Sequence, residues 1–173
     1  VQPTGSPVKV VKHDGFLLIS RYMDRDELIE RYGRNHNPFV SETRLVTPRD
    51  FFVFKLTFQE VQQRIVVRQD RMEFQFGGKA ARPLNRFLLG QYWEVQDKTA
   101  DPLPNFSERQ RRERLINSEL MPERPLTIPV GGSFTGLVLF SANFPDFGPA
   151  SLYVPVFTEG GDLIERVHIE YEY

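Results

Sequence analysis

Hydrophobic and polar residues alternate along several short segments of the chain, and this period of two is typical of half-buried β-strands. In residues 51–59, four large apolar side chains fall on one face of an extended chain: Phe52, Phe54, Leu56 and Phe58. Residues 72–76 repeat the pattern, and the segment 64–68 is expected to pair with them through a turn at Gln69 and Asp70. The pattern therefore predicts strands whose aromatic faces share one core.

The last third of the chain returns to this pattern in four segments, residues 126–130, 133–141, 150–158 and 162–173. Segment 133–141 is apolar on both faces, which indicates an inner strand that is covered on its second side as well. Pro155 cannot donate a backbone hydrogen bond, so it places its strand at a sheet edge or forms a bulge. Gly160 and Gly161 predict a tight hairpin before the last strand.

Near the N-terminus, residues 16–22 are predicted as the first strand, and a short helix follows. Asp24 is the expected N-cap of this helix, with Glu27 three residues later and Gly33 as the stop signal. Residues 35–50 have the Asn and Pro content of a loop.

Two more helices are expected in the middle of the chain. The second helix lies within residues 84–95, and its apolar face is expected to contain Leu84, Phe87, Leu88 and Tyr92. The third helix covers residues 107–120, where Ser107 and Gln110 have the spacing of a capping box. Its run of arginines is interpreted as a solvated face, with Glu108 and Arg112 as an ion pair one turn apart.

These elements predict a mainly β fold, an antiparallel β-sandwich with two or three short inserted helices. A closed β-barrel is the alternative architecture. Residues 1–7 are rich in Pro, Gly and Ser and are expected to form a flexible tether, and residues 8–173 a single sandwich domain.

The segment 126–157, "LTIPVGGSFTGLVLFSANFPDFGPASLYVPVF", resembles the immunoglobulin-like (telokin-like) domains of bacterial secreted proteins and lipoproteins. The residues that carry the resemblance are Gly132, Gly136, Val138, Phe140, Leu152 and Val154. Residues 37–59 also resemble the Asn-Pro-Phe segment and following strand of such domains. The resemblance implies an immunoglobulin-like sandwich, an exported location and a structural or interaction role without catalytic residues.

Composition narrows the classes of function. The net charge of −1 lacks the strongly basic footprint of a nucleic-acid binder, so no nucleic-acid partner is expected. The chain has no Cys, which excludes disulfides, thiol catalysis and Cys-ligated zinc within it. No apolar run reaches the roughly 18 residues of a membrane span, so no transmembrane segment is expected.

The chain begins with Val1 and the tether-like sequence VQPTGSP, which is typical of a processed terminus. We therefore expect an extracytoplasmic location: periplasmic, outer-membrane-associated or secreted. A lipid anchor ahead of this segment is a further expectation, and a cloning boundary would explain the same sequence.

Two motifs resemble catalytic or metal sites. His168, Glu170 and Glu172 alternate along one strand face and spread over about 14 Å, so they are interpreted as a solvent face and no metal site is predicted. His13 and Asp14 are adjacent, which points their side chains to opposite faces, and Asp14 with Gly15 predicts a turn. No catalytic residue and no cofactor are predicted.

The candidate partner-contact residues are Asn35, His36, Asn37, Tyr92 and Trp93. The first three lie in a polar loop, where binding residues tend to collect, and the last two are large aromatics with polar groups. The alternatives are a simple turn that plugs Phe39 into the core, and core packing for Trp93.

The sequence thus favours a non-enzymatic extracytoplasmic domain with a structural or partner-binding role, its partner being another protein or an envelope component. A carrier or sensor of small apolar ligands is the first alternative, and it requires a large cavity between the Phe-rich sheets. A hydrolase of unassigned type is the second, and it requires convergent acidic or His residues with shifted pKa values.

Overall fold

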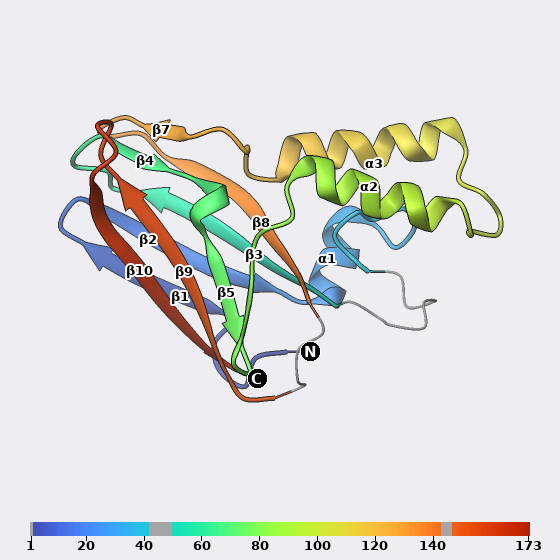
Figure 1. Ribbon diagram of the computed structural model, residues 1–173, viewed down its shortest axis with the longest axis horizontal. Helices are drawn as coiled ribbons and strands as arrows, with labels where there is room; N and C mark the ends of the chain where they lie inside the picture. The colour runs from blue at the N-terminus through green and yellow to red at the C-terminus, as the bar shows by residue number, and fades with distance from the viewer. Residues whose placement is uncertain (1, 42–49, 143–146) are drawn as a thin grey trace.

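The computed structural model describes residues 2–41, 50–142 and 147–173. Within these residues two antiparallel sheets pack face to face, and three helices gather at one end of them (Figure 1). The predicted mainly β sandwich with inserted helices is therefore confirmed. Residues 42–49, half of the loop expected over 35–50, lie outside the described part of the chain.

The first sheet has the strand order β1-β2-β3-β8. The bounds are Val8–His13 for β1, Phe16–Met23 for β2, Asp50–Gln59 for β3 and Phe134–Ala142 for β8. Strand β2 is the first strand that the sequence predicts, and β1 is an additional strand that pairs with it. Asp14 and Gly15 form the predicted turn between them, in which the Gly15 amide donates a hydrogen bond to His13 Nδ1 at 3.1 Å. The His13 side chain therefore stabilises the turn that follows its strand.

The second sheet is built around β9, which pairs with β10 on one side and with β5 and β4 on the other. The bounds are Ile65–Val67 (β4), Glu73–Phe76 (β5), Lys79–Ala81 (β6), Leu126–Ile128 (β7), Pro149–Phe157 (β9) and Leu163–Glu172 (β10). Strand β7 pairs with β4, and β6 pairs with β5. The predicted hairpin between β9 and β10 is confirmed, with Gly161 at a φ of 90°.

Strands β4 and β5 do not pair with each other, so the hairpin expected through Gln69 and Asp70 is wrong. A 3₁₀ turn, Gln69–Arg71, interrupts the chain, and both strands lie along the same side of β9. The prediction for Pro155 is also wrong, because β9 has neighbours on both sides and its pairing with β10 has no bulge at that residue. Pro155 lies opposite the break between β4 and β5, where the ladder does not require its missing N–H.

Aromatic rings fill the space between the sheets. Phe74 of β5 lies 5.0 Å from Phe52 and 5.2 Å from Phe54, measured between ring centroids. Phe74 is also 5.6 Å from Phe140, and Tyr171 is 5.2 Å from Phe54. Such pairs contribute about 0.5–1.5 kcal/mol each beyond the area they bury, so this cluster is a main source of stability.

The three helices cover the outer face of the first sheet at one end (Figure 1). They are α1 (Arg25–Tyr32), α2 (Arg86–Asp97) and α3 (Phe106–Glu119). Leu137 and Leu139 of β8 pack against them, while Val138 and Phe140 face the core between the sheets. The two apolar faces predicted for this strand are confirmed. The predicted inner position is wrong, because β8 is the last strand in the order of its sheet.

Capping explains where the helices begin. Asp24 accepts a hydrogen bond from the Glu27 amide, as the sequence predicts. The capping box of α3 is formed by Asn105 and Glu108, so the predicted pair Ser107 and Gln110 is wrong. The helix begins one residue earlier than expected because Asn is an equally good N-cap and Glu108 stands at the required spacing.

The apolar face predicted for the second helix is confirmed only for Leu84 and Tyr92, which pack partly buried against the cluster under the helices. Leu89, Trp93 and Gln96 are buried, whereas Phe87 is 65% exposed and Leu88 42% exposed. Burying Trp93 removes more apolar area from water than burying Leu88 would, and its indole N–H finds a backbone acceptor. The helix is therefore rotated by tertiary packing away from the face that residue spacing indicates.

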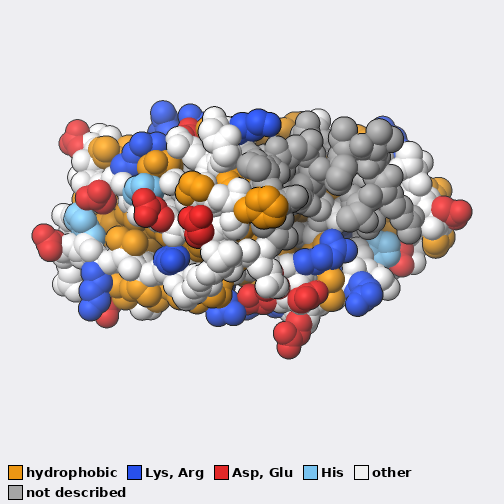
Figure 2. Space-filling view, turned by 90° about the horizontal axis from the view of Figure 1, so that it is seen from below, with side chains coloured by type: hydrophobic (Ala, Val, Ile, Leu, Met, Phe, Trp, Pro, Cys, Tyr) orange, Lys and Arg blue, Asp and Glu red, His pale blue; other side chains and the backbone are white. Residues whose placement is uncertain are grey.

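On the face of the molecule drawn in Figure 2, acidic, basic and hydrophobic side chains are interspersed, and neither sign of charge forms a continuous area among the described residues. None of the helices in the described ranges is long and apolar enough to cross a membrane.

Candidate functional site

A cleft of about 650 Å³ lies at the helical end of the sandwich. Its walls come from the loop that follows α1 (residues 34–36), the end of α2 with the loop after it (93–104), and the first turns of α3. Sites of this size, formed by loops on a rigid scaffold, are typical of ligand binding.

Asn37 holds in place the loop that forms one wall of the cleft. Its Nδ2 donates to the carbonyl oxygens of Leu28 and Gly33, both at 2.9 Å, and its Oδ1 accepts from the Phe39 amide at 3.0 Å. Phe39 is fully buried below the loop, as the simpler interpretation of this segment expects. Asn37 is itself buried and therefore supports the wall from behind.

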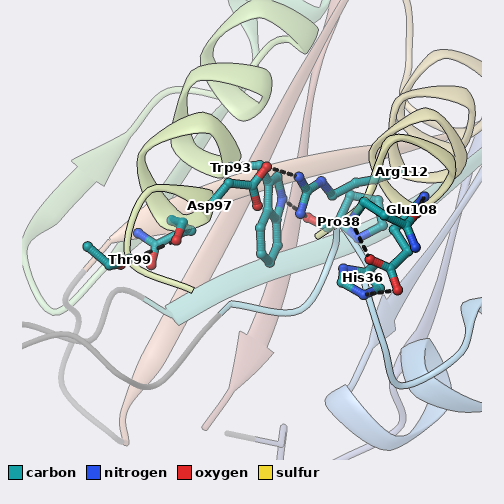
Figure 3. A network of polar contacts seen from close by, with 9 residues as sticks. His36, Pro38, Trp93, Asp97, Thr99, Glu108 and Arg112 are labelled. Atoms are coloured by element: carbon teal, nitrogen blue, oxygen red, sulfur yellow. Dashed lines mark hydrogen bonds and ion pairs between the residues drawn. The ribbon is translucent and has the colours of Figure 1, made fainter. Parts of the chain in front are cut away.

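His36 stands at the rim of the cleft in a left-handed backbone conformation, with a φ of 55°. Its Nε2 lies 3.2 Å from Glu108 Oε1, and Glu108 Oε2 also accepts a hydrogen bond from the Asn105 amide at 2.7 Å. This contact joins the loop to the N-terminus of α3 (Figure 3). The capping box of α3 therefore also fixes the position of a cleft residue.

Trp93 forms the apolar floor of the cleft. Its Nε1 donates to the Pro38 carbonyl oxygen at 3.0 Å, and the guanidinium of Arg112 lies 4.7 Å from the ring centroid. Trp93 is only 5% exposed, so most of the side chain serves the core, as the alternative for this residue expects. Its remaining surface lines the cleft.

Asp97 and Arg112 form an ion pair across the cleft's inner wall, joining α2 to α3 (Figure 3). The side chain of Arg112 is 6% exposed and that of Asp97 17% exposed. The predicted pair between Glu108 and Arg112 is wrong, because α3 turns Arg112 toward α2 and Glu108 toward the loop. An ion pair this deeply buried is unlike the solvated face expected for this helix.

The structure thus brings Asn35, His36 and Trp93 to one cleft. Asn37 lies behind the wall, and the Tyr92 ring packs 4.9 Å from that of Phe51, outside the cleft. Sequence reasoning missed the polar side chains that complete the lining: Arg34, Gln96, Asp97, Thr99, Asp101, Glu108 and Arg112. Asp97 had a usable signal, since it follows the Trp by four residues and so shares its helix face.

In the strand motif of β10, the His168 side chain contacts the neighbouring strand β9. His168 Nε2 lies 2.8 Å from Ser151 Oγ, and the His168 ring stacks on Tyr153 at 4.7 Å. In the described part of the chain, no group of three or more His, Cys, Asp or Glu side chains is placed to hold a metal ion.

Three buried tyrosines have raised pKa values, and all lie away from the cleft. Burial raises the pKa of Tyr171 to about 12, and its hydroxyl lies 2.8 Å from Ser20 Oγ. Burial and a hydrogen bond to Glu119 raise the pKa of Tyr32 to about 12. Burial also raises the pKa of Tyr173. These shifts have packing causes and do not indicate acid–base catalysis.

Neither a scan against models of protein families nor a search of curated proteins finds a match to this chain.

Proposed function

We propose that this protein is a non-catalytic binding module that holds its partner in the cleft at the helical end of the sandwich. The observation that carries the proposal is that the loop residues Asn35 and His36 and the aromatic Trp93, two groups predicted separately as contact residues, line one cleft of about 650 Å³. The cleft is also well supported from behind by hydrogen bonds and a buried ion pair. Preorganised walls favour binding because little conformational entropy is lost on association.

The arrangement of the polar groups supports binding over catalysis. A hydrolytic site that uses a Ser or Thr nucleophile needs that hydroxyl within hydrogen-bond reach of a base. His36 makes its contact with Glu108, and the Thr99 hydroxyl donates to the Gln96 carbonyl oxygen at 3.2 Å. The Thr99 hydroxyl is thus engaged by the end of its own helix, so the cleft gives no support to a hydrolase with a Thr nucleophile.

The carrier alternative also lacks support. A cavity for an apolar ligand would have to lie among the rings between the sheets, where Phe54, Phe74 and Phe140 are each fully buried. Their centroids are 5.2–6.0 Å apart, which is contact distance for aromatic pairs. In comparison with this aromatic core, the lining of the cleft at the helical end is polar.

The immunoglobulin-like type and the extracytoplasmic location remain part of the proposal. The sandwich architecture supports the first, although consecutive strands β1, β2 and β3 are neighbours here, whereas an immunoglobulin sheet has the order A-B-E-D. The second rests on the composition of residues 1–7. Reading the encoded sequence ahead of Val1 tests it: a signal segment supports export, and a continuous cytoplasmic domain contradicts it.

Amide NMR tests the binding site with a panel of chemically different compounds. The labelled protein is screened against neutral and charged sugars, amino acids, nucleotides and short peptides, and we expect the amides of residues 34–36, 96–101 and 108 to shift. Ala100→Phe adds a large side chain inside the cleft and should abolish the response. Val130→Phe, on an exposed residue outside the cleft, is the matched control and should bind normally. Compounds that shift only amides of the two sheets would contradict the proposal.

A further inference from the structure

We infer that the cleft takes a neutral polyhydroxyl ligand, a sugar that is either free or the end of a glycan chain. The inference rests on the proposed function, because it names the class of ligand for the same cleft. It follows from the charge balance of the lining, from the types of hydrogen-bonding group and from the apolar floor.

The charges that line the cleft nearly cancel. Two arginines, Arg34 and Arg112, face three carboxylates, those of Asp97, Asp101 and Glu108. Arg112 is neutralised by Asp97, and Glu108 lies 3.2 Å from His36 Nε2. The carboxylates would repel an anionic ligand, and the arginines would repel a cationic ligand, so a ligand of either charge meets like charges in the cleft. An uncharged ligand avoids both costs.

The lining nonetheless offers many polar groups, with donors and acceptors intermixed. Asn35 and Gln96 carry amides that donate and accept, Arg34 only donates, and Asp101 only accepts. A hydroxyl group donates one hydrogen bond and accepts others, so a ligand with several hydroxyls matches such a mixture. An apolar ligand would leave these groups without partners, at a cost of about 1–3 kcal/mol for each one that it buries.

The lining also presents apolar surface. It comes from Trp93, Ala100, Pro102 and Pro104. Sugar rings have C–H faces as well as hydroxyl edges, so a lining that combines polar and apolar groups suits them. The volume of about 650 Å³ is typical of sites for small organic molecules, so the ligand is no larger than a short oligosaccharide.

Trp93 makes the inference directly measurable, because it is the single Trp of the chain and lines the cleft. The intact protein is titrated with three neutral trisaccharides, maltotriose, cellotriose and N,N′,N″-triacetylchitotriose, and Trp emission is recorded. Glucose and N-acetylglucosamine test whether a free monosaccharide suffices. Trigalacturonic acid, a glucosamine trimer and a proline-rich peptide are the charged and peptide comparisons. We expect saturable changes with at least one neutral sugar, and a Kd that is almost the same at low salt and at about 0.5 M salt.

Two variants locate the binding. Arg34→Ala removes an exposed hydrogen-bond donor of the cleft and should weaken binding about tenfold. Arg114→Ala, an exposed residue of α3 outside the cleft, is the matched control and should leave Kd unchanged. Ala100→Phe should remove the fluorescence response entirely.

The remaining results separate the two proposals. If the charged oligomers or the peptide bind and Ala100→Phe blocks them, the sugar inference is overturned while the cleft remains the binding site. If no neutral sugar binds, the sugar inference is overturned, and the amide NMR screen decides the proposed function independently. If a neutral sugar binds equally well to Ala100→Phe, its site lies elsewhere and the inference is wrong.

Discussion

Replacing Asp97 by Ala should destabilise the protein strongly, because the change leaves the Arg112 guanidinium charged, unpaired and inside the helical end of the molecule. The Arg112 side chain is 6% exposed, so water cannot readily replace the lost carboxylate. Removing one partner of a buried ion pair typically costs about 3–5 kcal/mol. Asp97 itself is 17% exposed at the cleft, which places the expected loss near 3 kcal/mol. This is a large part of the roughly 5–15 kcal/mol that stabilises a typical domain.

Urea unfolding followed by circular dichroism measures the loss, provided that the slope of unfolding free energy against urea is unchanged. Glu159→Ala is the matched control, since Arg64 and Glu159 form a 2.9 Å pair whose side chains are 54% and 58% exposed. That variant should lose less than about 1 kcal/mol. A double variant, Asp97→Leu with Arg112→Met, removes both charges and should recover most of the stability lost by Asp97→Ala. If Asp97→Ala costs no more than Glu159→Ala, the pair is solvated and the reasoning is refuted.

Three further predictions concern the walls of the cleft and the sheet core. Asn37→Ala should lower the unfolding free energy by about 2 kcal/mol, because two carbonyl oxygens and one amide lose their partner. Asn35→Ala at the rim should cost less than about 0.5 kcal/mol. Thermal unfolding compares the two variants, and equal losses would contradict the role of Asn37. Trp93→Phe should lower the unfolding free energy measured in urea by about 1–3 kcal/mol, because Phe cannot donate a hydrogen bond to the Pro38 carbonyl oxygen. An unchanged midpoint would count against that hydrogen bond. Folded Tyr171 and Tyr32 have pKa values of about 12, against 10.0 for the ordinary group. Unfolded tyrosines ionise between pH 10 and 12 while the folded ones do not, so the stability that these two residues contribute should be unchanged up to about pH 10 and should fall between pH 10 and 12. Urea unfolding across that range checks it, and a flat profile above pH 10 would contradict the burial of these hydroxyls.

The sequence predicts those features of the fold that depend on local pattern. The aromatic face of β3 and the hairpin at Gly160 and Gly161 follow from alternation and from turn chemistry, which act over a few residues. The two apolar faces of β8 were also predictable, because a strand buried on both sides needs hydrophobic residues at successive positions.

Features that depend on distant partners were not predictable. Nothing within residues 64–76 shows that β4 and β5 both pair with β9, since the interrupting 3₁₀ turn looks like a reversing turn in the sequence. The same holds for Pro155, which is tolerated inside the sheet only because its neighbour is interrupted opposite to it.

The candidate site shows the same division. Loop polarity and aromatic content singled out Asn35, His36 and Trp93, but the ion pair that holds the site together joins residues on two helices. The spacing of Glu108 and Arg112 by four residues favours a pair on one helix, and only the packing of α3 against α2 directs Arg112 to Asp97 instead.

The most direct test of the central claim is an experimental structure of the protein bound to the tightest compound from the NMR screen. We expect the compound in the cleft, in contact with Asn35, His36 and the exposed edge of Trp93. A compound bound instead beside Phe87 and Gly90, in the groove on the other side of the pair formed by Asp97 and Arg112, or between the two sheets, would contradict the claim that the cleft is the binding site.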